Sequence, residues 1–238
     1  MDVKKIGLIL LIICVNMSNS LAQEFTKENL IGKGSPVFFG DGYNLSEEAH
    51  KAFLKMKEAA RLEGINIKVV SSYRNFEKQK SIWERKYKLF TSQGLSPKAA
   101  IQKIIEYSTI PGTSRHHWGT DIDIIDDNGK YSGDVLIPEK FHGKGPFCKL
   151  KDWLDVNANK YGFYIVYTDN ANRKGFKYEP WHYSYAMISK PMLKAYKKLN
   201  IKDILLEEKL LGSEYFTDEF IEKYLKENVL DINPELID

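Results

Sequence analysis

Apolar residues recur along the chain with two different spacings, and each spacing predicts one kind of element. From Ser46 to Glu63 the apolar residues fall on one helical face, and Gly64 follows as a stop signal. From Ile65 to Ser71 apolar and polar residues alternate, which is typical of a half-buried strand. The same criteria predict further helices at about 76–90, 97–107, 147–161, 191–198, 201–211 and 217–227, and further strands at about 120–125, 163–167 and 178–185.

The order of these elements lacks the regular strand–helix–strand rhythm that produces a parallel sheet. We therefore predict an α+β fold with a small central, mostly antiparallel sheet flanked by helices. Residues 23–43 contain several glycines and are expected to form an irregular lead-in to a main domain at 23–190. The charged helices at 191–238 are expected to form a C-terminal helical extension, an appendage to that domain, although they could instead rim a substrate groove.

The N-terminus has the pattern of a secretory signal peptide. Lys4 and Lys5 precede an apolar run at 6–15, and small residues then lead to a cleavage point between Ala22 and Gln23. The run is shorter than the roughly 20 residues that span a bilayer, so an uncleaved membrane anchor is the weaker alternative. We therefore predict a signal peptide at 1–22 and an exported protein, periplasmic or extracellular, with no stable membrane span after cleavage.

Composition narrows the class of protein without changing the predicted fold. Hydrophobic residues make up 43% of the 238 residues and charged residues 28%, which is ordinary for a soluble globular domain. The formal net charge of +3 is not concentrated in one run, which argues against nucleic-acid binding. Signal cleavage would remove Cys14 and leave Cys148 as the only cysteine, so we expect no intramolecular disulfide. A lipoprotein signal at Cys14 fits poorly because Ile13 is bulky where such a signal has a small residue. We expect the protein to be a monomer.

Candidate chemistry gathers in two short stretches, of which the first is residues 114–123. Asp121 and Asp123 lie two apart on a predicted strand, so both point to the same face. Two carboxylates on one face call for a balancing cation, and a zinc ion at Asp123 would supply one. A solvated strand edge with two acidic residues is the alternative. His116 and His117 are adjacent, and on composition alone either one could be a metal ligand.

The second stretch is Glu179-Pro180-Trp181-His182. Proline favours a bend here, which would let Glu179 and His182 approach one centre from different directions. Catalytic zinc sites commonly use three protein ligands of the His and carboxylate type, and His182 would complete such a set with the candidates of the first stretch. Glu179 could then act as the general base of a metal-assisted hydrolysis. The alternative is that Glu179 is a surface acid and Trp181 a core residue.

A third element ends the first predicted strand with the sequence Ser71-Ser72-Tyr73-Arg74. An arginine at a strand end can hold a carboxylate through two hydrogen bonds or stabilise a developing oxyanion. Arg74 alone is weak evidence because surface arginines are abundant.

Taken in this order, the motifs resemble those of the VanY-type zinc D-alanyl-D-alanine carboxypeptidases, which are LAS-type metallopeptidases. The resemblance rests on Ser-x-Tyr-Arg, a later Gln, Ser-x-His-x-x-Gly-x-x-x-Asp and Glu-Pro-Trp-His, and it spans about 67–185. It implies a small α+β domain with Zn²⁺ bound by His116, Asp123 and His182. It also implies that Glu179 is the base and that Arg74 contacts the substrate carbonyl or terminal carboxylate. Further substrate contacts are expected at Ser72, Tyr73, Gln79, Ser114 and Trp181.

The function implied by the resemblance is hydrolysis of the terminal D-alanine of peptidoglycan stem peptides by an exported, cell-wall-associated zinc metallopeptidase. Two alternatives stay open. One is a peptidoglycan endopeptidase on the same scaffold, and the other is an inactive zinc-containing module that binds the wall or signals. Glu179 argues against the inactive module, because a structural zinc site needs no base.

Two positions depart from the pattern of the family. This chain has Asp121 where the family often has a small residue, and Ser184 where the family often has a basic residue shortly after the last histidine. Neither departure removes a predicted zinc ligand. Both leave open whether Asp121 and His117 support the ligands or merely flank them.

Overall fold

The structure is a computed structural model that describes residues 25–237, so the predicted signal peptide lies outside the described residues. Its strands are β1 (Ile67–Ser71), β2 (Asp121–Asp126), β3 (Phe163–Ile165) and β4 (His182–Tyr185). Its α-helices are α1 (Lys27–Leu30), α2 (Glu47–Leu62), α3 (Phe76–Ser92), α4 (Pro97–Ile104), α5 (Cys148–Asn157), α6 (Ala186–Tyr196), α7 (Ile201–Glu207) and α8 (Asp218–Tyr224).

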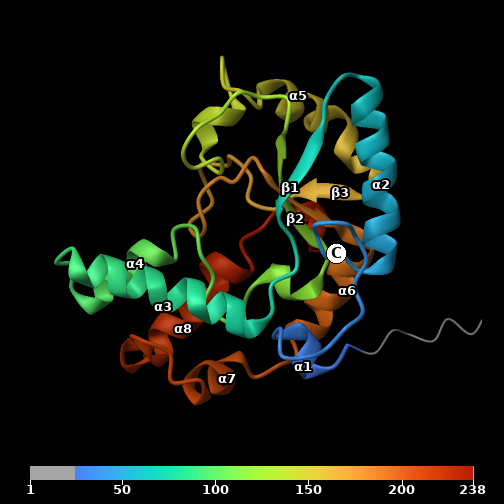
Figure 1. The fold of residues 1–238 in the computed structure, drawn as a ribbon. Coiled ribbons are helices and arrows are strands. Elements are labelled where there is room, and N and C mark those ends of the chain that lie inside the picture. The colour runs from blue at the N-terminus through green and yellow to red at the C-terminus, as the bar shows by residue number, and fades with distance from the viewer. Residues whose placement is uncertain (1–24, 238) are drawn as a thin grey trace, which may run out of the picture.

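The four strands form one sheet in the order β1-β2-β4-β3, and every neighbouring pair is antiparallel. Helices surround this sheet, as Figure 1 shows. The predicted α+β fold with a small antiparallel sheet flanked by helices is therefore confirmed. None of the described helices is long and apolar enough to cross a bilayer.

The alternation of side chains along β2 separates an apolar face of the sheet from a polar one. Ile122 and Ile124 point into a hydrophobic cluster beneath α2 and α5. Asp121 and Asp123 occupy the alternate positions and therefore point to the opposite face. The apolar cluster is built from Leu45, Ala49, Phe53, Met56, Ala60, Ile65, Ile67, Leu150, Trp153, Leu154, Ala158, Phe163 and Tyr183, together with the two isoleucines.

A second hydrophobic cluster joins the helices after β4 to α3 and α4. The C-terminal helices α7 and α8, orange to red in Figure 1, lie beside these two helices. Trp83 of α3 donates a hydrogen bond from its indole N–H to the carbonyl of Leu211 over 2.9 Å, and Asn228 reaches the carbonyl of Ile105 over 3.1 Å. Residues of the C-terminal segment thus complete the core on this side of the molecule.

Two tyrosines of the C-terminal segment hold the loop that leads toward the first candidate stretch. The hydroxyl of Tyr224 accepts a hydrogen bond from the Ile110 N–H over 3.0 Å and lies 2.7 Å from Oγ1 of Thr113. The hydroxyl of Tyr196 donates to the carbonyl of Gly112 over 3.0 Å. All these contacts are buried, so the C-terminal segment fixes the backbone just before Ser114.

We expect Tyr224→Phe to lower the free energy of unfolding by about 1–3 kcal/mol, because the buried Ile110 N–H loses its acceptor. Urea denaturation followed by circular dichroism measures this change. Tyr215→Phe, at the edge of the same cluster, is the matched control and should cost less than about 0.5 kcal/mol. Equal losses of stability for the two variants would contradict the role of the Tyr224 hydroxyl in holding residues 110–113.

Several elements differ in extent from those expected from the sequence, and three of the differences have a clear local cause. The lead-in contains the short helix α1, whose N-terminus is capped by Thr26, and four helical residues are too few to show a helical period. Helix α6 begins at Ala186 and includes Pro191, which was expected to start it. Strand β4 begins only at His182, because the preceding residues form a turn in which the His182 N–H donates to the carbonyl of Glu179 over 3.1 Å.

Candidate active site

The register of the sheet brings two candidate metal ligands together. Asp123 of β2 pairs directly with His182 of β4, and both side chains lie on the polar face. His116 comes from a single 3₁₀ turn just before β2. Gly119 ends that turn with a φ of 67°, a left-handed conformation that suits glycine and redirects the chain into the strand.

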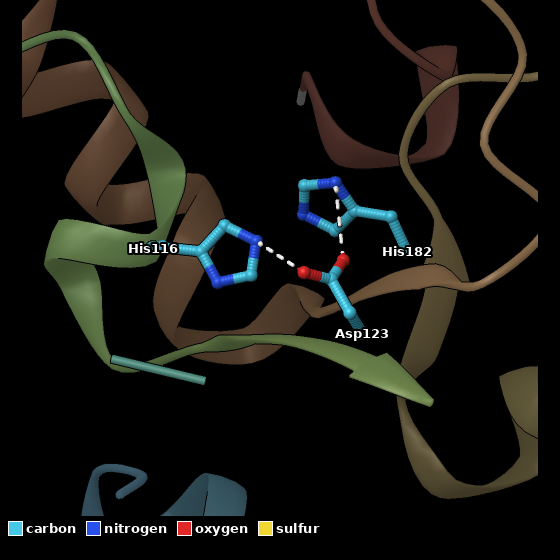
Figure 2. Close-up of side chains that lie close together, drawn as sticks. All are labelled: His116, Asp123 and His182. Atoms are coloured by element: carbon cyan, nitrogen blue, oxygen red, sulfur yellow. Dashed lines mark ion pairs between the residues drawn. The ribbon is translucent and has the colours of Figure 1, made fainter. Parts of the chain in front are cut away.

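The three side chains converge on one point, as Figure 2 shows. His116 Nε2 lies 3.4 Å from Asp123 Oδ2, and His182 Nδ1 lies 4.0 Å from Asp123 Oδ1. One ligand atom from each of the three residues lies within 4.8 Å of the other two, and all three residues are buried. Asp123 Oδ1 has no hydrogen-bond partner, which is costly for a buried carboxylate oxygen unless a cation satisfies it. Two imidazoles and one carboxylate in this arrangement fit zinc.

Hydrogen bonds on the far side of each ring orient the two histidines. His116 donates from Nδ1 to the carbonyl of Ser72 over 2.8 Å, which leaves the Nε2 lone pair directed at Asp123. His182 donates from Nε2 to Asp121 Oδ1 over 3.0 Å, which leaves Nδ1 directed at Asp123 and Glu179. Such outer contacts fix the tautomer and orientation of a metal-binding histidine. They assign Asp121 a supporting contact with His182.

Asp121 is balanced by a buried arginine. Arg115 Nε donates to Asp121 Oδ1 over 3.1 Å, and its Nη2 donates to Ser184 Oγ over 2.7 Å. Ser184 in turn donates to Asp121 Oδ2 over 2.8 Å. Burial alone would raise the pKa of Asp121, but Arg115 and His182 hold it well below its usual range. The two departures from the family pattern, at Asp121 and Ser184, therefore belong to one network.

His117 supports Arg74 and is not turned toward the candidate ligands. Its Nε2 accepts a hydrogen bond from the Gly112 N–H over 3.1 Å, so Nδ1 carries the proton and donates to the carbonyl of Arg74 over 2.6 Å. Burial lowers the pKa of His117 to about 3, so the ring is neutral. Since the Arg74 N–H also donates to the carbonyl of His116 over 3.0 Å, its backbone is held on both sides.

Glu179 lies on the turn before β4, where its Oε2 is 2.9 Å from His182 Nδ1. Burial raises the pKa of the Glu179 carboxyl, which suits a group that must accept and return a proton near neutral pH. Burial opposes a charge on His182, but its hydrogen bonds with Asp121 and Glu179 outweigh that effect and raise its pKa to about 10. The site therefore favours positive charge at this point, as a cation-binding site must.

These groups line a cavity of about 490 Å³. Of the predicted site residues, the cavity wall contains Arg74, Gln79, Ser114, His116, Asp123, Glu179, Trp181 and His182. Ser72 and Tyr73 do not line it. Ser72 accepts a hydrogen bond from the Asn44 N–H over 2.9 Å, and the ring of Tyr73 packs 4.0 Å from that of Phe38.

The cavity also contains charged residues that the sequence motifs did not indicate, notably Arg85, Lys86 and Arg115. Lys86 lies seven residues after Gln79 on α3, and residues two turns apart share one helical face. That spacing is a signal from which Lys86 could have been identified. Arg115 carries no comparable signal, because its direction depends on the 3₁₀ turn.

Comparison with known proteins decides the family. The family model of VanY, D-alanyl-D-alanine carboxypeptidase, matches residues 42–188, which is more than half of the chain. The chain belongs to the VanY family. The matched segment contains every candidate metal ligand and ends just after β4, so α7 and α8 lie beyond it.

Individual relatives agree with this assignment. The chain is 30% identical over 154 residues to a D-alanyl-D-alanine carboxypeptidase of Enterococcus faecalis, an alignment that covers 64% of this chain and 50% of that protein. A Bacillus subtilis relative is 31% identical over 165 residues, with 69% of this chain and 52% of the relative covered. The chain thus spans about half the length of these two curated relatives.

Two solved structures are similar to this one. The first is VanYB in complex with D-alanine-D-alanine, with a TM-score of 0.52, 27% identity and coverage of 72% of this chain and 88% of that one. The second is a mutant of the D,D-pentapeptidase VanY from the VanB-type resistance cassette in complex with Zn(II), with a TM-score of 0.50, 26% identity and coverage of 76% and 88%.

Proposed function

We propose that this chain is an exported zinc-dependent carboxypeptidase that hydrolyses the terminal D-alanine of peptidoglycan stem peptides. The observation that carries the proposal is the convergence of His116, Asp123 and His182 on one buried point beside Glu179. Membership of the VanY family and likeness to structures with Zn(II) and D-alanine-D-alanine support it. Export rests on the N-terminal sequence pattern, and action at the cell wall follows from it.

His116, Asp123 and His182 would hold the zinc ion, which supplies Lewis-acid polarisation of the scissile carbonyl and of the attacking water. Glu179 would accept a proton from the attacking water and return one to the leaving amine. Arg74, whose backbone is held on both sides, would contact the substrate and oppose developing negative charge. Gln79, Ser114 and Trp181 are proposed as further substrate contacts, since they line the same cavity.

The proposed domain organisation keeps a zinc peptidase domain at 23–190 and a C-terminal helical extension at 191–238. The extension would support catalysis indirectly, because Tyr196 and Tyr224 hold the loop before Ser114. We propose a monomer, with stem peptides as the substrate.

A peptidoglycan endopeptidase is the second candidate, because the same zinc chemistry could cut within the peptide. We expect the purified protein to release D-alanine from a stem pentapeptide and to leave unchanged the same peptide with a blocked C-terminus. Mass spectrometry of the products measures both reactions. Equal cleavage of the two peptides would favour the endopeptidase, and bound zinc without cleavage of either would favour an inactive wall-binding module.

A further inference from the structure

Three cations of the described structure line the active-site cavity without forming ion pairs, although its wall also contains the carboxylates of Asp134 and Glu139. Arg74, Arg85 and Lys86 all line this cavity. Arg115 and His182 contact carboxylates there, whereas these three cations form no ion pair with a carboxylate among residues 25–237. Unpaired cations in a partly enclosed cavity are suited to binding an anionic group of a ligand.

Lys86 is the member of this wall with the most constrained ammonium group. It is half-buried, and its Nζ donates to Ser108 Oγ over 2.6 Å. An ammonium has three donors, so this contact orients the group and leaves two donors for a ligand. Burial lowers the pKa of Lys86, with Arg85 and Arg74 adding to the effect and Glu179 and Asp134 opposing it. An anion bound beside the ammonium would offset the burial further.

Arg74 and Lys86 reach the cavity from different places: Arg74 is hydrogen-bonded to the segment that carries His116, whereas Lys86 is hydrogen-bonded to Ser108. The backbone of Arg74 is hydrogen-bonded to His116 and His117, so its side chain starts beside the metal site. Lys86 starts two helical turns beyond Gln79, on the same face of α3. The terminal carboxylate of a substrate lies only one residue, about 3.5 Å, beyond the scissile carbonyl. A residue that binds this carboxylate must therefore line the same cavity as the metal ligands without being one of them.

We propose that the Lys86 ammonium, oriented by Ser108, binds the terminal carboxylate of the substrate, and that Arg74 thereby serves the scissile carbonyl. This assignment rests on the proposed carboxypeptidase function and makes Lys86 a specificity-determining residue. A peptide that continues beyond the scissile residue, or that ends in an amide, would leave the half-buried ammonium without its anion. Discrimination against such ligands follows from that unpaired charge.

Binding to a Glu179→Ala variant tests the assignment without turnover. The two probes are an N-acetylated stem peptide that ends in D-alanyl-D-alanine with a free carboxylate, and the same peptide with a C-terminal amide. Isothermal titration calorimetry on the zinc-loaded protein measures both dissociation constants. We expect Lys86→Met to raise the Kd of the carboxylate peptide by about 10- to 100-fold, as loss of a charge-assisted hydrogen bond requires, and to change the Kd of the amide by less than twofold.

Two further variants complete the test. Lys86→Arg keeps the charge and should retain most of the preference for the carboxylate peptide. Lys88→Met removes an exposed lysine of the same helix outside the cavity and should leave both Kd values unchanged. The proposal is overturned if Lys86→Met leaves the ratio of the two Kd values as it is with Lys86 present. It is also overturned if the Glu179→Ala protein with Lys86 present binds neither peptide. Zinc-dependent release of D-alanine by the unmutated protein is measured separately, and its failure would count against the proposed function itself.

Discussion

Replacing Glu179 with alanine is expected to lower kcat for D-alanine release by a factor of about 10² to 10⁴ while zinc stays bound. The reason is that Glu179 contacts His182 Nδ1 from beside the proposed ligand set and is not one of the three ligands. The buried Glu179 carboxyl, whose pKa is raised, lies closer to His182 Nδ1 than the Asp123 carboxylate does, and it is therefore placed to transfer protons beside the ligand set. Turnover of a stem pentapeptide and zinc content by mass spectrometry are measured on the same preparation.

Two comparisons make this prediction specific. Glu77→Ala removes an exposed acid in the first turn of α3 and should leave kcat within a factor of two. His182→Ala removes a proposed ligand and should lose zinc as well as activity. Undiminished hydrolysis by the Glu179→Ala variant would exclude Glu179 as the base, and loss of its zinc would make it a ligand instead.

Replacing Arg115 with methionine is expected to lower the free energy of unfolding by about 3–5 kcal/mol, the usual cost of leaving one partner of a buried ion pair alone. Arg115 is 3% exposed and Asp121 fully buried, so water cannot replace the lost contact. The substitution also removes the hydrogen bond from Arg115 to Ser184 and the contact of the guanidinium with the Trp118 ring, 4.7 Å away. Denaturation of the zinc-free protein isolates this effect from metal binding.

The double variant Arg115→Met/Asp121→Ala separates charge from packing. It removes both charges together, so we expect it to be more stable than Arg115→Met alone, which is a non-additive result for residues in direct contact. Its zinc affinity should still fall by about 10- to 100-fold, because His182 Nε2 has lost its acceptor. Additive losses of stability in the double variant would show that the two residues do not act as a pair.

The shared face of Asp121 and Asp123 could be predicted from the sequence because strand parity is a local property. Asp123 and Asp121 had to share a face of β2, and the antiparallel pairing with β4 then placed His182 opposite Asp123. What the sequence could not supply was the cation that balances Asp121. Arg115 lies six residues away in a 3₁₀ turn, and only the folded turn directs its side chain back to the strand.

Other differences have equally local causes. The predicted strand at 178–185 is shortened because Pro180 lacks an N–H for the sheet ladder and the chain turns there. The role of His117 required knowledge of two backbone groups, at Gly112 and Arg74, that are far apart in sequence. The contacts of Tyr196 and Tyr224 with residues 110–113 are tertiary as well, and nothing in a helical pattern indicates which loop a helix will hold.

The most direct test of the proposed zinc-dependent carboxypeptidase activity is mass spectrometry of muropeptides before and after treatment with the protein, once reconstituted with zinc and once stripped of it by a chelator. Pentapeptide stems are expected to lose a single terminal D-alanine with the zinc-loaded protein and to remain unchanged with the stripped one. Cleavage inside the stem, or the same products with and without zinc, would contradict the proposed activity.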